Sequence, residues 1–82
     1  MLYMCQAIQT KYHGPTNRIG ARVSARCDAG RIMVSWDNKL NADGNHRKAA
    51  ETLAAKLGWT QKLVGGGLPG GGYAFVLLDE EN

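Results

Sequence analysis

The sequence lacks several features that would assign it directly to a class of protein. No apolar run approaches the roughly 20 residues that a membrane-spanning helix needs. A signal peptide has a basic group before its apolar stretch, and the first residues of this sequence have none. Only two cysteines, Cys5 and Cys27, are present, and a reducing compartment leaves such thiols unpaired. We therefore expect a cytoplasmic protein in which Cys5 and Cys27 do not form a structural disulfide.

Metal ligands and catalytic groups are also scarce. The two histidines, His13 and His46, and the two cysteines show neither C-x-x-C nor H-x-x-x-H spacing, so we expect no metal site and no cofactor. Ser24 and Ser35 lack a G-x-S-x-G motif, and no pair of carboxylates stands out. Spacing alone does not exclude a cysteine and a histidine that meet only in space. We assign no catalytic residue and expect a protein that is not an enzyme.

Glycine, in contrast, is abundant in one segment, residues 64–76, VGGGLPGGGYAFV. Gly65, Gly67 and Gly70 match the phosphate-binding pattern G-x-G-x-x-G, but that motif needs a helix after the glycines. Here a proline interrupts the pattern and a strand-like run follows, so nucleotide binding is not expected. The composition predicts a long hairpin loop over residues 65–72, with Leu68 near its tip as an adaptable partner contact.

Alternation of side chains predicts strands in the first half of the chain. In residues 18–27 the apolar side chains point one way, while Arg18, Arg22 and Arg26 point the other way. Residues 31–37 alternate again after a turn at residues 28–30, which predicts a hairpin. Residues 2–12 are extended in character and end in a turn, HGPTN, so that three antiparallel strands are expected.

The second half predicts one helix and two further strands. Residues 46–58, HRKAAETLAAKLG, place alanines and leucines on one face, with Asp43 or Asn45 as the cap and Gly58 as the stop. His46 then lies on the apolar side, as a structural histidine. The segment YAFVLL is apolar on both faces, which predicts a central strand, a covered second face or an oligomer contact such as a homodimer.

These elements predict a single α+β domain over residues 1–82. We expect an antiparallel sheet of four or five strands with one α-helix packed on one face, in the order β-β-β-α-β-β. With 82 residues the core is small, and there is no room for an internal catalytic cavity with a lid.

Basic charge is concentrated in the first half of the chain. Residues 1–36 carry five basic side chains and one acidic one, whereas residues 37–82 carry five and six. An arginine-rich sheet face suits the phosphates of nucleic acid or an acidic protein surface, although a merely solvated face has the same pattern. Interleaved aromatic residues, which single-strand binders use for stacking, are missing from it. The predicted contact residues are Arg18, Arg22, Arg26, Arg31, Lys11 and Leu68.

The order of segments resembles small accessory proteins of phages and mobile elements. The resemblance is carried by QTKYHGPTN, HRKAAETLAAKLGW and LVGGGLPGGGYAFV and covers roughly residues 6–77. Proteins of this kind include anti-CRISPR inhibitors, and those directed at type I systems bind Cascade subunits. The resemblance implies a non-enzymatic inhibitor that binds a bacterial defence complex and blocks recognition of target DNA. It assigns no functional residue.

Two other functions agree with the sequence. One is a small nucleic-acid-binding module that uses the same arginines. The other is an accessory subunit of an enzyme that acts only as a dimer.

Overall fold

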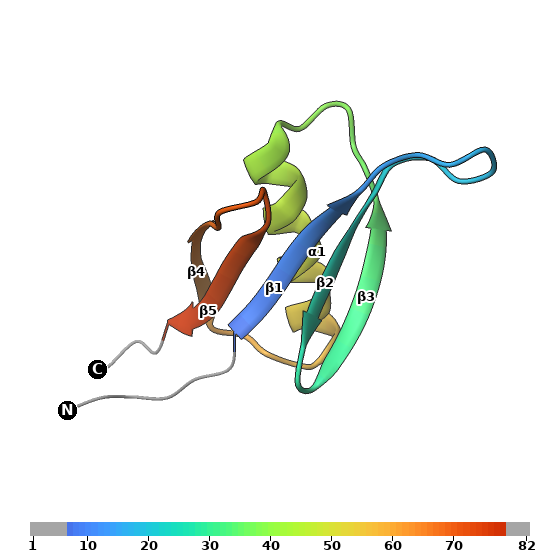
Figure 1. The fold of residues 1–82 in the computed structure, drawn as a ribbon. Helices are drawn as coiled ribbons and strands as arrows, with labels where there is room; N and C mark the ends of the chain where they lie inside the picture. Colours follow the sequence, from blue (N-terminus) through green and yellow to red (C-terminus); the bar gives the residue numbers. More distant parts are fainter. Residues whose placement is uncertain (1–6, 79–82) are drawn as a thin grey trace.

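The computed structural model describes residues 7–78 and shows a five-stranded antiparallel sheet with one helix packed on it (Figure 1). This confirms the predicted α+β class and the order β-β-β-α-β-β. The elements are β1 (Ala7–His13), β2 (Arg22–Cys27), β3 (Gly30–Ser35), α1 (Ala42–Lys56), β4 (Lys62–Gly67) and β5 (Tyr73–Leu78). No helix within residues 7–78 is both long and apolar enough to cross a membrane.

The strands lie in the order β3-β2-β1-β5-β4, so the first strand occupies the centre of the sheet. β1 pairs on one side with β2 and on the other side with β5, and every neighbouring pair is antiparallel. Two hairpin systems, one from each half of the chain, therefore meet along β1.

The hydrophobic core lies between α1 and one face of the sheet. Val23 and Ala25 of β2 are fully buried there, as the alternation predicts, and Leu53 of α1 packs on the same cluster. The helix presents several alanines to the sheet, which allows a close approach. The opposite face of the sheet is not covered by any described segment (Figure 1).

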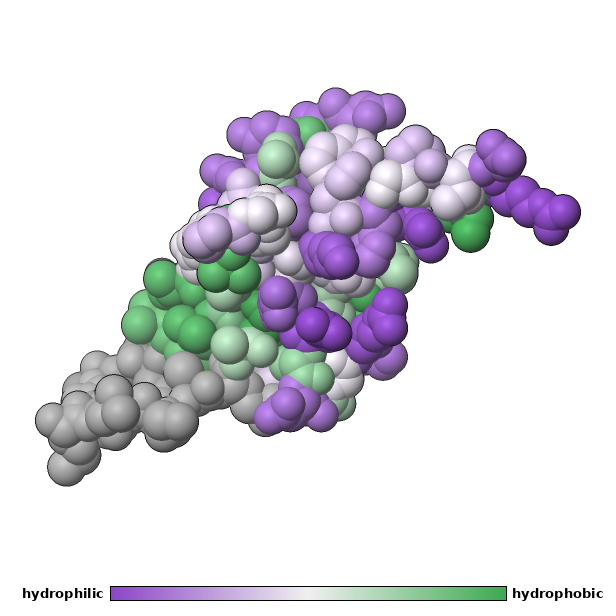
Figure 2. Space-filling model, viewed as in Figure 1, coloured by the Kyte–Doolittle hydropathy of each residue, from purple (hydrophilic) through white to green (hydrophobic). Residues whose placement is uncertain are grey.

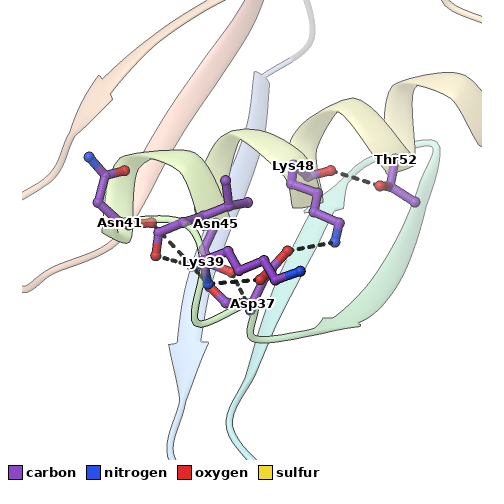
Figure 3. A network of polar contacts seen from close by, with 7 residues as sticks. Asp37, Lys39, Asn41, Asn45, Lys48 and Thr52 are labelled. Atoms are coloured by element: carbon purple, nitrogen blue, oxygen red, sulfur yellow. Dashed lines mark hydrogen bonds and ion pairs between the residues drawn. The ribbon is translucent and has the colours of Figure 1, made fainter.

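The connection between β3 and α1 is closed by the buried side chain of Asn45 (Figure 3). Its Oδ1 accepts a hydrogen bond from the Asp37 amide at 2.7 Å, and its Nδ2 donates to the Asp37 carbonyl at 2.9 Å. The carbonyls of Leu40 and Asn41 lie within 3.2 and 3.1 Å of the same Nδ2. One amide therefore satisfies backbone groups along the whole connection.

The helix begins at Ala42, four residues before the predicted start, and its cap is neither Asp43 nor Asn45. Asn41 is the N-cap, and its Oδ1 accepts from the Gly44 amide at 2.8 Å. Gly44 lies in the first turn, and glycine disfavours a helix there, which explains why the sequence predicts a start several residues too late. The buried contacts of Asn45 offset that preference. The predicted stop is confirmed, since Gly58 has φ of 78°.

The predicted eight-residue glycine loop is too long, because Gly65–Gly67 belong to β4 and the loop spans residues 68–72. Gly65 pairs with Phe75, and a Cβ at this position would lie 2.3 Å from Phe75 Cδ1. Glycine is therefore required by the packing of Phe75 against the edge of the sheet. Gly70 and Gly71 have positive φ and form the turn itself.

The strand that carries the arginines is shorter than predicted. It begins at Arg22, and residues 14–21 form a loop that extends away from the sheet (Figure 1). Thr16 closes this loop, since its amide donates to the Ile19 carbonyl at 2.7 Å. The predicted inward position of Ile19 is wrong, because Ile19 is exposed. In the first strand, residues 2–6 of the predicted range lie outside the described residues, and β1 extends to His13.

Candidate functional site

The uncovered face of the sheet carries most of the predicted contact residues. We call it the open face, and its members are the strand residues whose side chains point away from α1. In β1, β2 and β3 these include the four basic residues Lys11, Arg22, Arg26 and Arg31, which form the basic half. Figure 2 shows hydrophilic residues over this part of the sheet.

Strand register brings the basic residues together. Arg26 lies opposite Arg31 on β3 and opposite Gln9 on β1. Lys11 pairs with Ser24, one step along the same face from both Arg22 and Arg26. Directly opposed residues in an antiparallel sheet have Cβ atoms about 5 Å apart, so the positive charges repel one another.

The described part of the chain supplies no counter-charge to this half. None of Lys11, Arg22, Arg26 and Arg31 forms an ion pair with a described residue, and the open face of β1–β5 contains no Asp or Glu. The ion pair between Lys48 and Asp37, at 3.7 Å, instead joins α1 to the connection that precedes it (Figure 3). The basic half is thus positioned to bind an anionic group from outside.

The pKa of His13 is affected by the positive charges of the basic half. Its Nε2 lies 2.9 Å from Ser24 Oγ on the neighbouring strand. Partial burial lowers the pKa of His13, and the charges of Arg22, Lys11 and Arg31 lower it further. The neutral imidazole is therefore favoured on this face.

Arg22 differs from the other basic residues because it is half-buried. Its Nε is sealed from solvent and has no hydrogen-bond partner among the described residues. An unpartnered guanidinium N–H in this position is unfavourable. Part of the Arg22 side chain is thus packed within the folded protein, while its positive charge belongs to the basic half.

The other part of the open face is mostly apolar, apart from Lys62 of β4, which lies opposite Leu78. Val64, Val76 and Leu78 are 49%, 37% and 44% exposed, and Val64 lies directly opposite Val76. We call these three residues, with Ala7 and Ala74 beside them, the apolar half. Figure 2 shows hydrophobic residues gathered over β5. Exposed apolar residues that adjoin one another are typical of an interaction surface.

Two predicted contact residues do not lie on this face. Arg18 is in the extended loop between β1 and β2 rather than on a strand, because the alternating pattern continues beyond the last paired residue. Leu68 is in the β4–β5 loop, where it lines a cavity on the helix side of the sheet. The structure thus brings together Lys11, Arg22, Arg26 and Arg31 only.

Sequence reasoning did not assign the apolar half to the site. The signal was present in YAFVLL, which is apolar on both faces. The structure shows that Phe75 faces the core while Val76 and Leu78 face outward, and no described segment covers them.

Within residues 7–78, no group of three or more His, Cys, Asp or Glu side chains is arranged to hold a metal ion. Cys27 is half-buried against the core. Cys5 lies outside the described residues, so the absence of a disulfide between Cys5 and Cys27 stays a prediction.

Comparison with known proteins gives no relative for this chain: no family model, no curated protein and no solved structure matches it.

Proposed function

We propose that this chain is a non-enzymatic binding protein that docks the open face of its sheet onto an acidic surface of a partner protein. The observation that carries the proposal is the opposed pair Arg26 and Arg31, which no described acidic residue neutralises. A like-charge pair is destabilising in the free protein. A carboxylate of a partner would relieve the repulsion through bidentate hydrogen bonds.

The apolar half favours a protein over a nucleic acid as the partner. Val64, Val76 and Leu78 would bury their exposed surface against apolar groups of the partner, next to the ionic contact. The open face has no Phe, Tyr or Trp on which bases could stack. A phosphate backbone would match the basic half alone.

The resemblance to small accessory proteins of phages and mobile elements suggests which partner this would be. The partner would be a bacterial defence complex, such as a Cascade subunit, in the cytoplasm of the host cell. Occupation of an acidic surface on that complex would block recognition of target DNA. This form depends on the likeness of the sequence, whereas the docking face depends on the geometry.

The test compares two double variants of equal charge. Arg26→Glu with Arg31→Glu reverses the opposed pair, and both side chains are exposed, so the fold should persist. Lys39→Glu with Arg47→Glu changes the net charge by the same amount outside the open face. Each tagged protein is used in pull-downs from a host that carries several defence systems, with mass spectrometry of the bound proteins.

We expect the wild-type protein and the Lys39/Arg47 variant to retain a defence protein, and the Arg26/Arg31 variant to lose it. Equal retention by both variants would remove the open face from the proposal. A gel-shift assay with short DNA and RNA tests the alternative function, a nucleic-acid-binding module. Tight, salt-sensitive binding to free nucleic acid that the Arg26/Arg31 variant loses would instead assign a nucleic-acid-binding module.

A further inference from the structure

A second concave surface lies on the helix side of the sheet, separate from the open face. It is a cavity of about 520 Å³ at the end of β1, bordered by the first turn of α1 and by the β4–β5 loop. Its walls include Tyr12, Trp36, Tyr73, His46 and Leu68. Sites for small molecules commonly have volumes of about 300–1,000 Å³ and aromatic walls with a few polar groups.

Three aromatic rings line this cavity in two orientations. Tyr12 and Trp36 meet edge to face, with centroids 5.2 Å apart and an interplanar angle of 81°. Tyr73 packs on the ring of His46, with centroids 4.3 Å apart. The Tyr73 hydroxyl donates to the carboxylate of Asp43, which holds the ring in place. Tyr12 is 46% exposed, so part of its surface is available for a contact.

His46 supplies the polar group. It is only 2% exposed, and its Nδ1 lies 2.7 Å from Thr10 Oγ1. We assign the tautomer in which Nδ1 carries the proton and donates to Thr10, while the Thr10 hydroxyl donates to the Tyr73 carbonyl 3.5 Å away. Nε2 then bears a lone pair, no hydrogen bond joins it to a described residue, and it is not sealed from solvent as Arg22 Nε is. In this tautomer an acceptor on a residue that lines the cavity favours a ligand with a donor group.

The β4–β5 loop forms the remaining wall. The Leu68 amide donates to the Gly72 carbonyl at 2.7 Å, which closes the turn. Gly67, Gly71 and Gly72 border the cavity without side chains to fill it, while Leu68 adds one apolar contact. The glycine-rich segment therefore forms one wall of the cavity.

We propose that this cavity binds a small planar heteroaromatic molecule that packs against Tyr12, Trp36 and Tyr73 and donates a hydrogen bond from a ring N–H to His46 Nε2. A free cation is a poorer occupant, although aromatic rings attract cations. Ala42 brings the positive end of the α1 dipole to the same cavity. The site does not depend on the open face, which lies on the other side of the sheet.

Indole and adenine serve as probes, and 1-methylindole is the matched control that has the indole ring without the N–H. Substitution of Trp59 by Phe leaves Trp36 as the fluorescent reporter among the described residues. We expect saturable changes in Trp36 fluorescence with adenine, and in the Trp36 and His46 ring signals by NMR with at least one N–H probe, since indole itself fluoresces in the tryptophan range. 1-Methylindole should bind about tenfold more weakly than indole, because it lacks the donor.

A second variant tests the aromatic wall at Tyr12, which lies outside the hydrophobic core and contacts the ring of Trp36. Tyr12→Ala removes an exposed ring and should weaken binding about fivefold or more while thermal unfolding stays cooperative. The proposal is overturned if neither indole nor adenine gives a saturable signal at millimolar concentration. Equal affinity for indole and 1-methylindole, or unchanged His46 signals on binding, would likewise overturn it.

Discussion

Arg26 and Arg31 lie directly opposite each other on β2 and β3, with both side chains on the open face. Neither forms an ion pair with a described residue. A β-hairpin that places two like charges in register gives up stability for a surface that attracts anions.

Arg31→Glu should stabilise the free protein. The substitution converts a repulsive cross-strand pair into an attractive one, which should raise the free energy of unfolding by about 0.2–1 kcal/mol. Urea unfolding at low salt measures the difference, and about 1 M NaCl should reduce it by screening. Arg31→Gln is the control, because it removes the repulsion without adding attraction. A variant less stable than wild type at both salt concentrations would contradict the prediction.

Gly65→Ala should destabilise the protein by about 1–3 kcal/mol through overpacking. The new Cβ would lie 2.3 Å from Phe75 Cδ1 and 2.6 Å from the Ala74 carbonyl oxygen. Gly66→Ala is the matched control, because a Cβ at that position meets nothing within 4 Å. Urea midpoints of the two variants should therefore differ clearly. Similar midpoints would show that the ring of Phe75 can move aside.

Asn45→Ala should destabilise the protein more than loss of the helix cap does. It leaves the Asp37 amide without its side-chain acceptor, and an unsatisfied buried group costs about 1–3 kcal/mol. Asn41→Ala removes the cap and should cost about 1 kcal/mol. Lys48→Ala breaks a partly exposed ion pair and should change stability by well under 1 kcal/mol. Chemical unfolding of the three variants checks this order.

Acid should destabilise the protein in the range where its histidines titrate. Burial lowers the pKa of both His13 and His46 in the folded state, although Asp43 partly opposes the shift at His46. The unfolded chain therefore binds more protons as the pH falls below the ordinary value of 6.5, and the stability present above that value is lost towards the lowered pKa values.

Urea unfolding at several pH values, with NMR titration of both rings, measures this loss. His13→Gln should reduce the dependence on pH, because it removes one of the two groups. Arg22→Gln should raise the pKa of His13, since the Arg22 charge is one cause of its shift. A stability that does not change as the pH is lowered from about 7 to about 5 would contradict the assignment.

The regular elements could be predicted because local pattern and tertiary structure agree there. Alternation in β2 and β3 identified Val23, Ala25, Ile32 and Val34 as facing the core, and the helical period identified Leu53. The same alternation placed Arg22, Arg26 and Arg31 on one face. It failed at Arg18, since a pattern of side chains does not show where hydrogen-bonded pairing stops.

The remaining features depend on contacts between distant residues. Glycine has low strand propensity, so the sequence does not show that Gly65 belongs to β4, which follows from its pairing with Phe75 on β5. Asn45 acts through backbone groups of the preceding connection, which no local rule anticipates. Tyr12, Trp36 and Tyr73 come from three separate segments, and their convergence around one cavity requires the strand register.

The central position of β1 also determines when this protein can fold. Its two partners, β2 and β5, come from early and late parts of the sequence, so the middle of the sheet is complete only after β5 has been synthesised. A nascent chain on the ribosome can form the β1–β2–β3 meander earlier, but one edge of β1 then remains unpaired. That edge is exposed to wrong partners until β5 has left the ribosome, and slow release of β5 would favour aggregation.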